Sequence, residues 1–457
     1  MKHFILSSLL LALLATSCTN SKTGNNSVVR LITLDPGHFH AALVQKSMYE
    51  GVDSTVYVYA PAGEELNQHL KKIDAYNHDS LNPTQWNEEV YTGSDFLDKM
   101  LAEKKGNAVI ISGNNRRKTE YIQKSVEAGF NVLADKPMAI DQKNFEILKK
   151  TFATAAEKKV LLYDIMTERS EITNTLQREL AALPEVFGQL QKGTPENPAV
   201  EMVSVHYFYK SVSGSTLIRP AWFMDVAQQG EGITDVATHL VDLVQWECFP
   251  DKTIDYQKDI QLVGANRWST PMTLDQFSAI TKLSAFPEYL KSALDKNQVL
   301  QLYVNGEIDY KLFGTYVKIK ALWDYKATAG GDNHYSILKG SKSNLIIKQG
   351  AEQNYKPTLY IEPIAGGNTE SYTQTLLETF KSLEAKYPGI ELKKGSAIWE
   401  VVIPEKYKVG HEAHFAQVTN RFLDYLKNGN IPTWEVPNMI AKYFTTTQAL
   451  EMAKNKK

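Results

Sequence analysis

Three residues in the middle of the chain have the types and spacing of a proton-transfer site. Asp235, His239 and Asp242 are separated by four and three positions, which predicts that they lie on one stripe of a helix. A carboxylate one turn before a histidine can fix the tautomer of that histidine and stabilise the imidazolium. The imidazole could then accept a proton from a hydroxyl group. The alternative is an ordinary helix whose histidine is satisfied in the core.

A second candidate group lies upstream. Asp135-Lys136-Pro137 follows a short apolar segment, at the point where a buried strand would end. A lysine ammonium at that place can hydrogen-bond a substrate oxygen and favour its deprotonation. By itself, the motif is equally consistent with a surface lysine before a turn proline.

The turn after the first apolar segment is a candidate anion-binding turn. The sequence Asp35-Pro36-Gly37-His38-Phe39-His40 stands where a dinucleotide fold has G-x-G-x-x-G, whose glycines let the backbone approach a pyrophosphate. Only the central glycine is present, although the imidazole in the third position could donate to a phosphate. The second strand ends without the acidic residue that would bond a ribose hydroxyl. The expected cofactor contacts here are Gly37, His38, Phe39 and His40.

The same turn has two other interpretations. His38-x-His40 at a strand end resembles the paired metal histidines of barrel amidohydrolases. Two histidines are too few for a metal site, and the later strands offer no matching ligands, so we predict no metal. The turn could also be a tight turn whose histidines bind nothing.

Taken together, these stretches resemble the Gfo/Idh/MocA oxidoreductase family. That family has Glu-Lys-Pro at the end of a sheet strand, where this chain has Asp135-Lys136-Pro137. It also has a Gly-rich loop and a helix with D-x-x-x-H-x-x-D spacing, as in residues 230–242 here. The resemblance spans about residues 29–450 and departs from the family pattern at the phosphate turn. It implies catalytic roles for Lys136, Asp235 and His239.

The resemblance also implies contacts to cofactor and substrate. The loop that runs past the cofactor would be Ser112, Gly113, Asn114 and Asn115, beside Asp135 and Lys136. Arg169 falls where the family often has Arg or Asn after its sixth strand. Other substrate contacts are expected from polar or aromatic residues on segments that should face the cleft, namely His206, Arg219, Trp222 and His334. A tryptophan there could stack on a sugar face, or could simply belong to the core.

The first half of the chain supplies a scaffold for these residues. Apolar segments at 29–34, 55–59, 108–112, 131–134 and 160–163 alternate with helical segments at 41–49, 96–104, 118–128 and 144–158. This pattern predicts βαβ units and a parallel sheet. The stretch 61–90 reads as polar and irregular. We predict an α/β Rossmann-like domain over residues 29–165.

The second half has a different character. Longer alternating segments at 203–209 and 310–323, and a short one at 345–347, indicate strands, and helices are expected near 172–182, 233–247, 411–426 and 440–453. We predict an α+β domain with an open, mostly antiparallel sheet over residues 166–457. His411 and His414 read as structural or surface residues, and Cys248 as buried packing.

Composition limits the function classes. The chain has 457 residues, of which 43% are hydrophobic and 22% charged, which excludes collagen-like, disordered and coiled-coil proteins. Lys and Arg total 50 against 52 Asp and Glu, so the basic excess of a nucleic-acid binder is missing. Two cysteines, Cys18 and Cys248, exclude a disulfide framework.

The N-terminus reads as an export signal. Lys2 and His3 precede an apolar run over residues 4–14, which is shorter than the ~20 residues needed to span a bilayer. The following Ala15-Thr16-Ser17-Cys18 resembles a bacterial lipobox, with a plain signal peptide as the alternative. We expect a signal peptide over residues 1–17, lipidation of Cys18, a polar tether over 18–28, and an exported lipoprotein that faces the periplasm. No twin-arginine pair is present, so export would take place in the unfolded state.

The family resemblance implies a reaction. NAD or NADP would be the cofactor, and a secondary hydroxyl of a sugar, glycoside or cyclitol would be oxidised, with Lys136 polarising the oxygen and His239 as base. Outside the cytosol the cofactor would have to be tightly bound. Two alternatives stay open: redox-neutral cleavage of a glycoside through transient ring oxidation, and a carbohydrate-binding lipoprotein without catalysis. A homodimer or homotetramer is expected.

Overall fold

The computed structural model describes residues 28–456 apart from 213–214, 328–330 and 368. The expected signal peptide and Cys18 therefore lie outside the described residues. Within the described part of the chain, no helix is long and apolar enough to cross a membrane.

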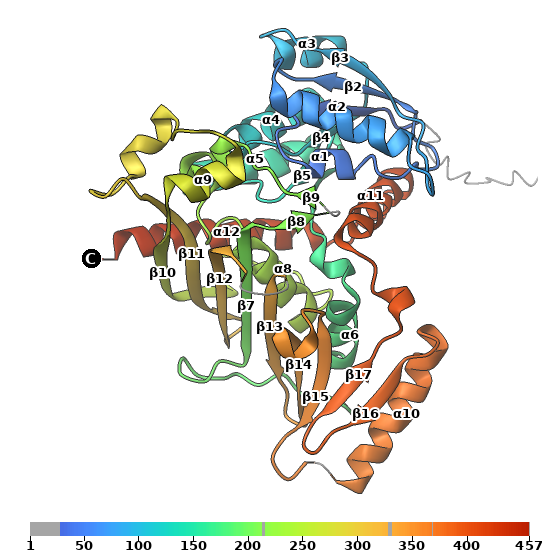
Figure 1. The fold of residues 1–457 in the computed structure, drawn as a ribbon. Coiled ribbons are helices and arrows are strands. Elements are labelled where there is room, and N and C mark those ends of the chain that lie inside the picture. Colours follow the sequence, from blue (N-terminus) through green and yellow to red (C-terminus); the bar gives the residue numbers. More distant parts are fainter. Residues whose placement is uncertain (1–27, 213–214, 328–330, 368, 457) are drawn as a thin grey trace, which may run out of the picture.

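The N-terminal part is built on a parallel sheet. Among the described residues, six strands form this sheet in the order β3-β2-β1-β4-β5-β6. The strands are β1 (Leu31–Leu34), β2 (Thr55–Tyr59), β3 (Asn87–Tyr91), β4 (Ala108–Ile111), β5 (Asn131–Asp135) and β6 (Leu162–Ile165). Strands β1, β4 and β6 are buried at every position, because helices cover both faces of the sheet (Figure 1). The predicted Rossmann-like domain is confirmed.

The connecting helices show where the sequence pattern was misleading. They are α1 (His40–Leu43), α2 (Glu64–Asn77), α3 (Phe96–Glu103), α4 (Asn115–Glu127) and α5 (Gln142–Lys158). The stretch 61–90, predicted to be irregular, contains α2 and β3. Helix α2 buries only Leu66, His69 and Ile73, and β3 is an edge strand with no fully buried residue, so neither has a strong apolar signal. Helix α1 is one turn long, shorter than the predicted 41–49.

The second part contains a large mixed sheet. Nine strands of the described chain form it in the order β10-β11-β12-β7-β13-β14-β15-β17-β16, and only the β12–β7 pair is parallel. The strands are β7 (Val200–Tyr209), β10 (Ile260–Met272), β11 (Leu300–Leu312), β12 (Thr315–Lys326), β13 (Asn333–Lys339), β14 (Ser343–Gln349), β15 (Thr358–Pro363), β16 (Glu391–Lys394) and β17 (Trp399–Val402). The short strands β8 (Ser211–Val212) and β9 (Ser215–Thr216) pair separately. The predicted mostly antiparallel sheet is confirmed.

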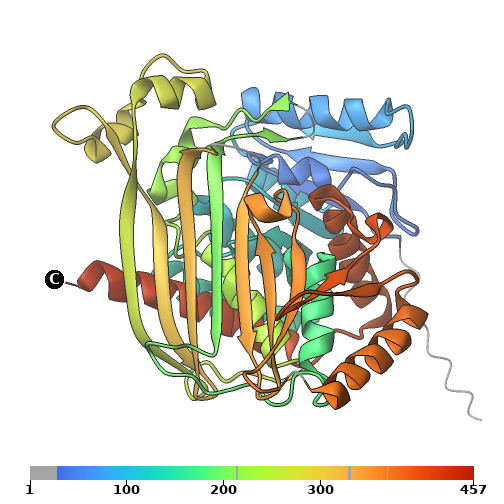
Figure 2. The ribbon, with the colours of Figure 1, turned by 60° about the horizontal axis from the view of Figure 1, so that its bottom comes forward.

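Helices cover one face of this sheet. Figure 2 shows the strands in front, with α6 and α8 behind them. Strand β12 alternates buried and partly exposed residues over its first eight positions, as expected for a sheet with one covered face. The helices are α6 (Ile172–Ala181), α7 (Val226–Gln229), α8 (Ala237–Cys248), α9 (Leu274–Thr281), α10 (Glu370–Lys386), α11 (His411–Asn428) and α12 (Glu435–Asn455). The 3-10 turns are η1 (Glu168–Ser170), η2 (Ala221–Met224), η3 (Glu288–Ala293), η4 (Ala351–Gln353) and η5 (Glu405–Tyr407).

The last two helices join the two parts of the molecule. Helix α11 packs against β6 and α1, and its Phe415 and Phe422 belong to the core of the N-terminal sheet. Helix α12 contacts α5 of the N-terminal part and also α8 and β10 of the second part. The N-terminal part up to residue 165 is one continuous segment of the chain. Helices near the C-terminus nevertheless complete the core of its sheet.

Candidate active site

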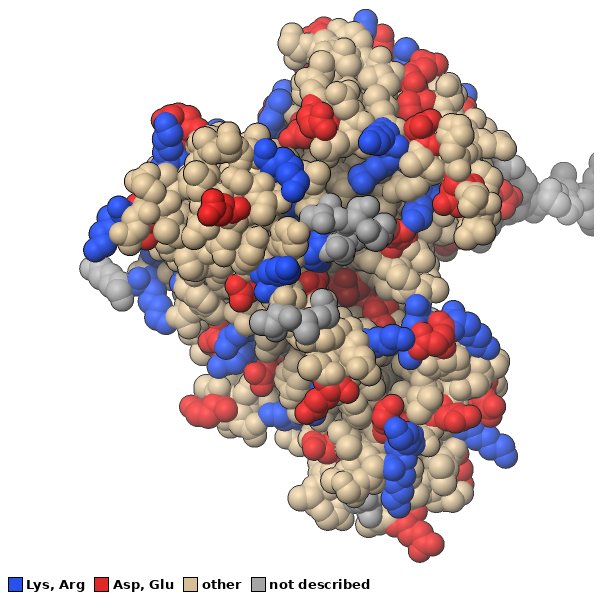
Figure 3. Space-filling view, in the orientation of Figure 1, with Lys and Arg blue, Asp and Glu red and all other residues tan. Residues whose placement is uncertain are grey.

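The candidate residues meet at the carboxyl edge of the parallel sheet. Strands β1 and β4 are neighbours at the centre of the sheet, where the strand order reverses, and such a point opens a crevice for ligands. The turn over residues 35–40 follows β1, the loop over 112–115 follows β4, and Asp135 ends β5. Figure 3 shows the hollow between the two parts of the molecule, with acidic side chains visible inside it.

Lys136 and Asp235 form an ion pair across this crevice. Nζ of Lys136 lies 2.6 Å from Oδ1 of Asp235, and both side chains are largely buried. The other carboxylate oxygen of Asp235 accepts a hydrogen bond of 3.2 Å from Nε2 of Gln229. The carbonyl of Gln229 in turn accepts a hydrogen bond of 2.7 Å from the Asn115 amide. The loop after β4, the end of β5 and the loop before α8 therefore form one hydrogen-bonded unit.

Two glycines fix the loop that carries Asp235. A Cβ atom on Gly232 would lie 1.9 Å from the carbonyl oxygen of Val304, and one on Gly306 would lie 2.2 Å from a side-chain carbon of Ile233. The loop can therefore lie directly on strand β11. Because α8 begins only at Ala237, Asp235 precedes the helix, and the predicted helical stripe does not include it. The carboxylate of Asp235 holds Lys136 rather than the imidazole of His239.

His239 stands in the first turn of α8 as a neutral imidazole. Burial, followed by the charges of Lys136 and His411, lowers the pKa of His239 well below its usual value. Its Nδ1 atom is buried and has no hydrogen-bond partner among the described residues. A neutral imidazole keeps one nitrogen without a proton, and such a nitrogen within the influence of the Lys136 charge is suited to accept a proton from a substrate hydroxyl.

Asp242 belongs to a buried ionic cluster rather than to the crevice. Its carboxylate binds Arg169 at 2.6 and 2.7 Å and Nζ of Lys442 at 2.8 Å. Although burial raises the pKa of Asp242, the two cations outweigh it and hold that pKa below its usual range. The guanidinium of Arg169 also binds Glu435 at 3.0 Å and is 4% exposed, so the structure gives Arg169 no free surface for a substrate. The expected stripe over 235, 239 and 242 is wrong, because these side chains face different partners.

Unlike a glycine-rich turn, the turn after β1 has two carboxyl groups beside it, those of Asp35 and Glu65. Asp35 adopts a positive φ of 48° and accepts a hydrogen bond of 2.7 Å from the Tyr121 hydroxyl. Nε1 of Trp222 donates a hydrogen bond of 2.7 Å to Glu65, and both side chains lie next to Gly37. Burial is the main cause that raises the pKa values of Asp35 and Glu65. Trp222 is 7% exposed, so it packs over the turn.

The carboxylate of Asp135 lies close to both histidines of the same turn. Its Oδ2 atom lies 2.9 Å from Nδ1 of His40, 3.7 Å from Nδ1 of His38 and 3.0 Å from Oγ of Ser112. The sequence predicted that the later strands offer no metal ligand to match the two histidines. Asp135 supplies such a ligand, because β5 lies next to β4 and the end of β5 reaches the β1 turn. Phe39 packs against both imidazoles. Beneath Asp135, the buried Lys118 donates a hydrogen bond of 3.0 Å to its backbone carbonyl.

The loop after β4 contributes through both backbone and side chains. The carbonyl of Ser112 accepts a hydrogen bond of 3.3 Å from the backbone N–H of His38. Gly113 lies against the β1 turn, since a Cβ there would be 2.3 Å from the Asp35 carbonyl oxygen. Asn114 caps helix α4 and donates a hydrogen bond of 2.7 Å to Gln228.

The second part of the molecule adds polar and aromatic residues. Nδ1 of His206 lies 3.2 Å from Asp332, which also binds Lys210 at 2.7 Å. The imidazole of His206 packs on the ring of Trp323 with a centroid separation of 5.2 Å. Arg219 is buried over Phe223 and Trp323.

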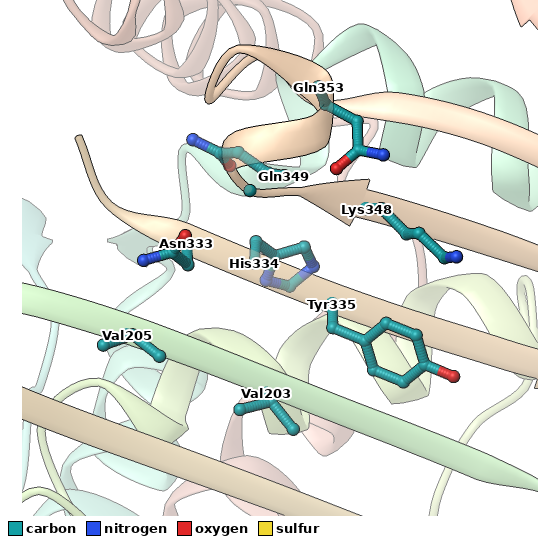
Figure 4. A pocket seen from close by; sticks show the side chains of 9 residues that line it. Val203, Val205, Asn333, His334, Tyr335, Lys348, Gln349 and Gln353 are labelled. Atoms are coloured by element: carbon teal, nitrogen blue, oxygen red, sulfur yellow. The ribbon is translucent and has the colours of Figure 1, made fainter. Parts of the chain in front are cut away.

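His334 lies opposite Ser204 in the β13–β7 pairing, and therefore on the same face of the sheet as His206. It also lines a cavity of about 270 Å³ formed by β7, β13 and β14. Figure 4 shows this cavity, with Val203 and Val205 on one strand and His334 and Tyr335 on the next. Burial lowers the pKa of His334 to about 4, and its Nε2 has no partner in the described chain.

Two residues of the crevice were missed by sequence reasoning. Nε2 of His411, at the start of α11, lies 3.3 Å from Nε2 of His40, although residue 411 was expected to be structural or at the surface. Glu168, in the turn after β6, is close enough to Lys136 and Asp332 for their charges to affect it. Burial, followed by Glu171, raises the pKa of Glu168 to about 7. The sequence contained no spacing signal for either residue, because both reach the crevice through the tertiary fold.

The crevice fits a dinucleotide at the end where Lys136 lies. It is at the switch point of the sheet, the β1 turn and the β4 loop pack together there at Gly37 and Gly113, and Asn115 Oδ1 and His239 Nδ1 are buried and unpartnered in the described structure. These residues, together with Ser112 and Asn114, would hold the nicotinamide half. The adjoining turn lacks the usual third glycine.

Comparisons with known proteins agree with this geometry. Residues 37–165 match the family described as "Oxidoreductase family, NAD-binding Rossmann fold", and residues 176–454 match "Putative oxidoreductase C terminal domain". The crystal structure of a "putative oxidoreductase" from Parabacteroides merdae shares 55% identity and a TM-score of 0.92, over 94% of this chain and 98% of that one.

More distant structures share the fold alone. A "putative myo-inositol dehydrogenase" from Sinorhizobium meliloti has 13% identity and a TM-score of 0.54, over 94% of this chain and 98% of the other. An "oxidoreductase domain protein" from Kribbella flavida has 13% identity and a TM-score of 0.61, with the same coverage. No curated protein matches the chain. The two family matches and the Parabacteroides structure establish that the chain belongs to the Gfo/Idh/MocA family of NAD(P)-dependent oxidoreductases.

Proposed function

We propose that this oxidoreductase oxidises a secondary hydroxyl of a sugar, glycoside or cyclitol, with Lys136 and His239 as the reacting groups. One observation carries the proposal: a lysine ammonium, held at 2.6 Å by Asp235, lies near a neutral histidine whose buried nitrogen has no partner within the described residues. The donor and the acceptor needed to deprotonate an alcohol are therefore present together.

The roles follow from the contacts. Lys136 donates a hydrogen bond to the substrate oxygen and stabilises the negative charge that develops there, while Asp235 keeps the ammonium in place. His239 accepts the hydroxyl proton on the unprotonated nitrogen of its ring, because its lowered pKa keeps the imidazole neutral. NAD(P)⁺, when bound, accepts the hydride from the carbon.

The substrate class rests on the residues of the second part. The imidazole of His206, the carboxylate of Asp332 and the ammonium of Lys210 offer polar contacts beside the ring of Trp323. Such a mixture of hydrogen-bonding groups and an aromatic face suits a polyhydroxylated ring. Two proteins that share the fold are described as a "putative myo-inositol dehydrogenase" and "a 3-ketoreductase".

The first experiment measures bound cofactor. The full chain is purified without added cofactor from cytosolic and exported preparations, denatured, and its supernatant assayed for NAD(P)(H) by mass and absorbance. We expect near-stoichiometric dinucleotide in both. A protein that contains none, and binds none on titration, would contradict the proposal.

The second experiment separates the catalytic lysine from a surface lysine. Lys136→Met is expected to lower kcat by about 10²–10⁴-fold, the usual contribution of a positioned proton-transfer group, with an unchanged circular dichroism spectrum. The matched control Lys124→Met removes an exposed lysine paired with Glu120 and should leave kcat unchanged. Equal activity of the two variants would exclude Lys136 from the reaction.

Glu168 favours a second candidate function, redox-neutral glycoside cleavage. Its pKa of about 7 leaves a carboxylic acid near Lys136 that could protonate a departing sugar oxygen. Transient oxidation of a ring hydroxyl to a ketone acidifies the neighbouring C–H bond, and loss of that proton expels the sugar leaving group. Water then adds to the resulting enone, and the hydride is returned to the ketone. This reaction would release sugar from a glycoside without accumulating NADH, and Glu168→Gln would slow the release. Accumulation of one NADH per turnover would exclude it.

A further inference from the structure

The β1 turn and the end of β5 place three metal-ligating side chains together. One nitrogen of His38, one nitrogen of His40 and a carboxylate oxygen of Asp135 all lie within 4.8 Å of one another. A tetrahedral ion bound at about 2.1 Å by each ligand holds ligand pairs about 3.4 Å apart, so an inward shift of the ligands completes the set. Two histidines and one carboxylate form a donor set typical of zinc and ferrous iron.

We propose that His38, His40 and Asp135 bind one divalent transition-metal ion of the zinc class. This inference goes beyond the proposed oxidation and does not depend on it. The sequence offered only the two histidines, and the fold adds the carboxylate by bringing the end of β5 beside the turn after β1.

The surroundings of the three ligands suit a metal. On the far side of His40, its Nε2 atom lies 3.3 Å from Nε2 of His411, so an Nε2–H of His40 can donate to His411 while Nδ1 faces Asp135. A partner on the second nitrogen is what orients a metal-bound imidazole. Phe39, Phe223 and Phe415 pack against the imidazoles and limit their movement.

The hydrogen bonds around Asp135 leave its carboxylate available to a metal. Lys118 donates its hydrogen bond to the backbone carbonyl of Asp135 and leaves the carboxylate oxygens to the histidines and Ser112. A cation bound at Nδ1 of His40 would take the place of the hydrogen bond between that nitrogen and Asp135.

The test measures metal binding on the full chain without cofactor or substrate. The protein is stripped with a chelator and titrated with Zn²⁺ against a chromophoric competitor, and Co²⁺ is added separately to record its visible absorption. We expect one equivalent of Zn²⁺, a ligand-field spectrum with Co²⁺, and a higher melting temperature with Zn²⁺.

Variants identify the ligands. His38→Gln and Asp135→Asn should each weaken Zn²⁺ binding at least tenfold, and His411→Gln should weaken it about 10–100-fold, as loss of an orienting partner does. The matched control is His78→Gln, which removes an exposed histidine 3.3 Å from Asp74, a similar pair outside the cluster. Circular dichroism measures whether each variant is folded. If Asp135→Asn does not fold, the affinity of His38→Gln alone decides the test. Absence of a stoichiometric site, or equal affinity in His38→Gln and the wild type, would overturn the proposal.

Discussion

At the scale of single residues, buried histidines tie the stability of the protein to pH. His69 is 3% exposed, and neither of its ring nitrogens has a hydrogen-bond partner among the residues described. Burial lowers its pKa to about 4 from a usual value of 6.5. Between these two values the unfolded chain binds the proton and the folded chain does not. The contribution of His69 to stability is therefore complete above pH 6.5 and is lost as the pH falls toward 4.

We therefore expect His69→Leu to gain stability relative to the wild type as the pH falls. The difference in unfolding free energy should change by up to about 1.4 kcal/mol per pH unit between pH 6.5 and 4, and should be constant above pH 7. Urea denaturation at several pH values measures it. Because other titrating groups are common to both proteins, the difference isolates this histidine, and a pH-independent difference would contradict the assignment.

At the scale of elements, a buried ionic cluster joins β6, α8 and α12. Nζ of Lys442 lies 2.7 Å from Asp164 and 2.8 Å from Asp242, and Lys442 is 0% exposed. Lys442→Met leaves two carboxylates in the interior without this cation and should lower the unfolding free energy by about 3–5 kcal/mol. Lys454→Met on the same helix removes a half-exposed lysine that lies 3.7 Å from Glu231, and should cost at most about 1 kcal/mol. Denaturant melts of both variants measure the difference, and equal losses would show that the cluster is not stabilising.

The loop that carries Asp235 is positioned by close packing. Gly232→Ala would force a Cβ to within 1.9 Å of the Val304 carbonyl, so the loop must move away from β11 and take Asp235 from Lys136. We expect a loss of at least tenfold in kcat, since small displacements of a reacting group are costly. Gly410→Ala is the control, because nothing lies within 4 Å of its added Cβ. Unchanged kinetics in Gly232→Ala would mean that this packing does not place the site.

The sequence predicted the sheets better than the site. Segments such as Leu31–Leu34 and Ala108–Ile111 are short apolar runs between polar segments, so their composition alone predicted that they are buried strands. The edge strand Asn87–Tyr91 carries no such signal, because an edge strand buries little. In the site, Lys136 and Asp235 were found by motif, but Asp235 was assigned to the wrong partner. Spacing along a helix predicts a stripe only where the helix has already begun, and α8 begins at Ala237.

At the scale of the whole molecule, the N-terminal domain depends on the C-terminal helices. Phe415 and Phe422 of α11 are each 1% exposed and lie in the core of the N-terminal sheet. We expect residues 28–165, expressed alone, to bind hydrophobic dyes and to melt without a cooperative transition, while the full chain melts cooperatively. Calorimetry and dye fluorescence measure this. A cooperative transition in the fragment would show that the domain folds by itself.

The attachment of the molecule to a membrane is a proposal from the sequence. Cys18 precedes the described residues and follows the expected signal peptide. Cys18→Ser should move the protein from the membrane fraction to the soluble periplasmic fraction and abolish incorporation of labelled palmitate. Fractionation of cells that express the two forms measures this, and an unchanged distribution would contradict lipidation.

Because α11 and α12 pack against the N-terminal part, they also determine when that part can finish folding. A ribosome makes the strands of the N-terminal sheet first, yet the residues that seal this sheet are among the last to be synthesised. Contacts of such long sequence separation form late. We therefore expect the nascent chain to stay open until its final helices are made, a state that suits the export in unfolded form that we propose from the sequence.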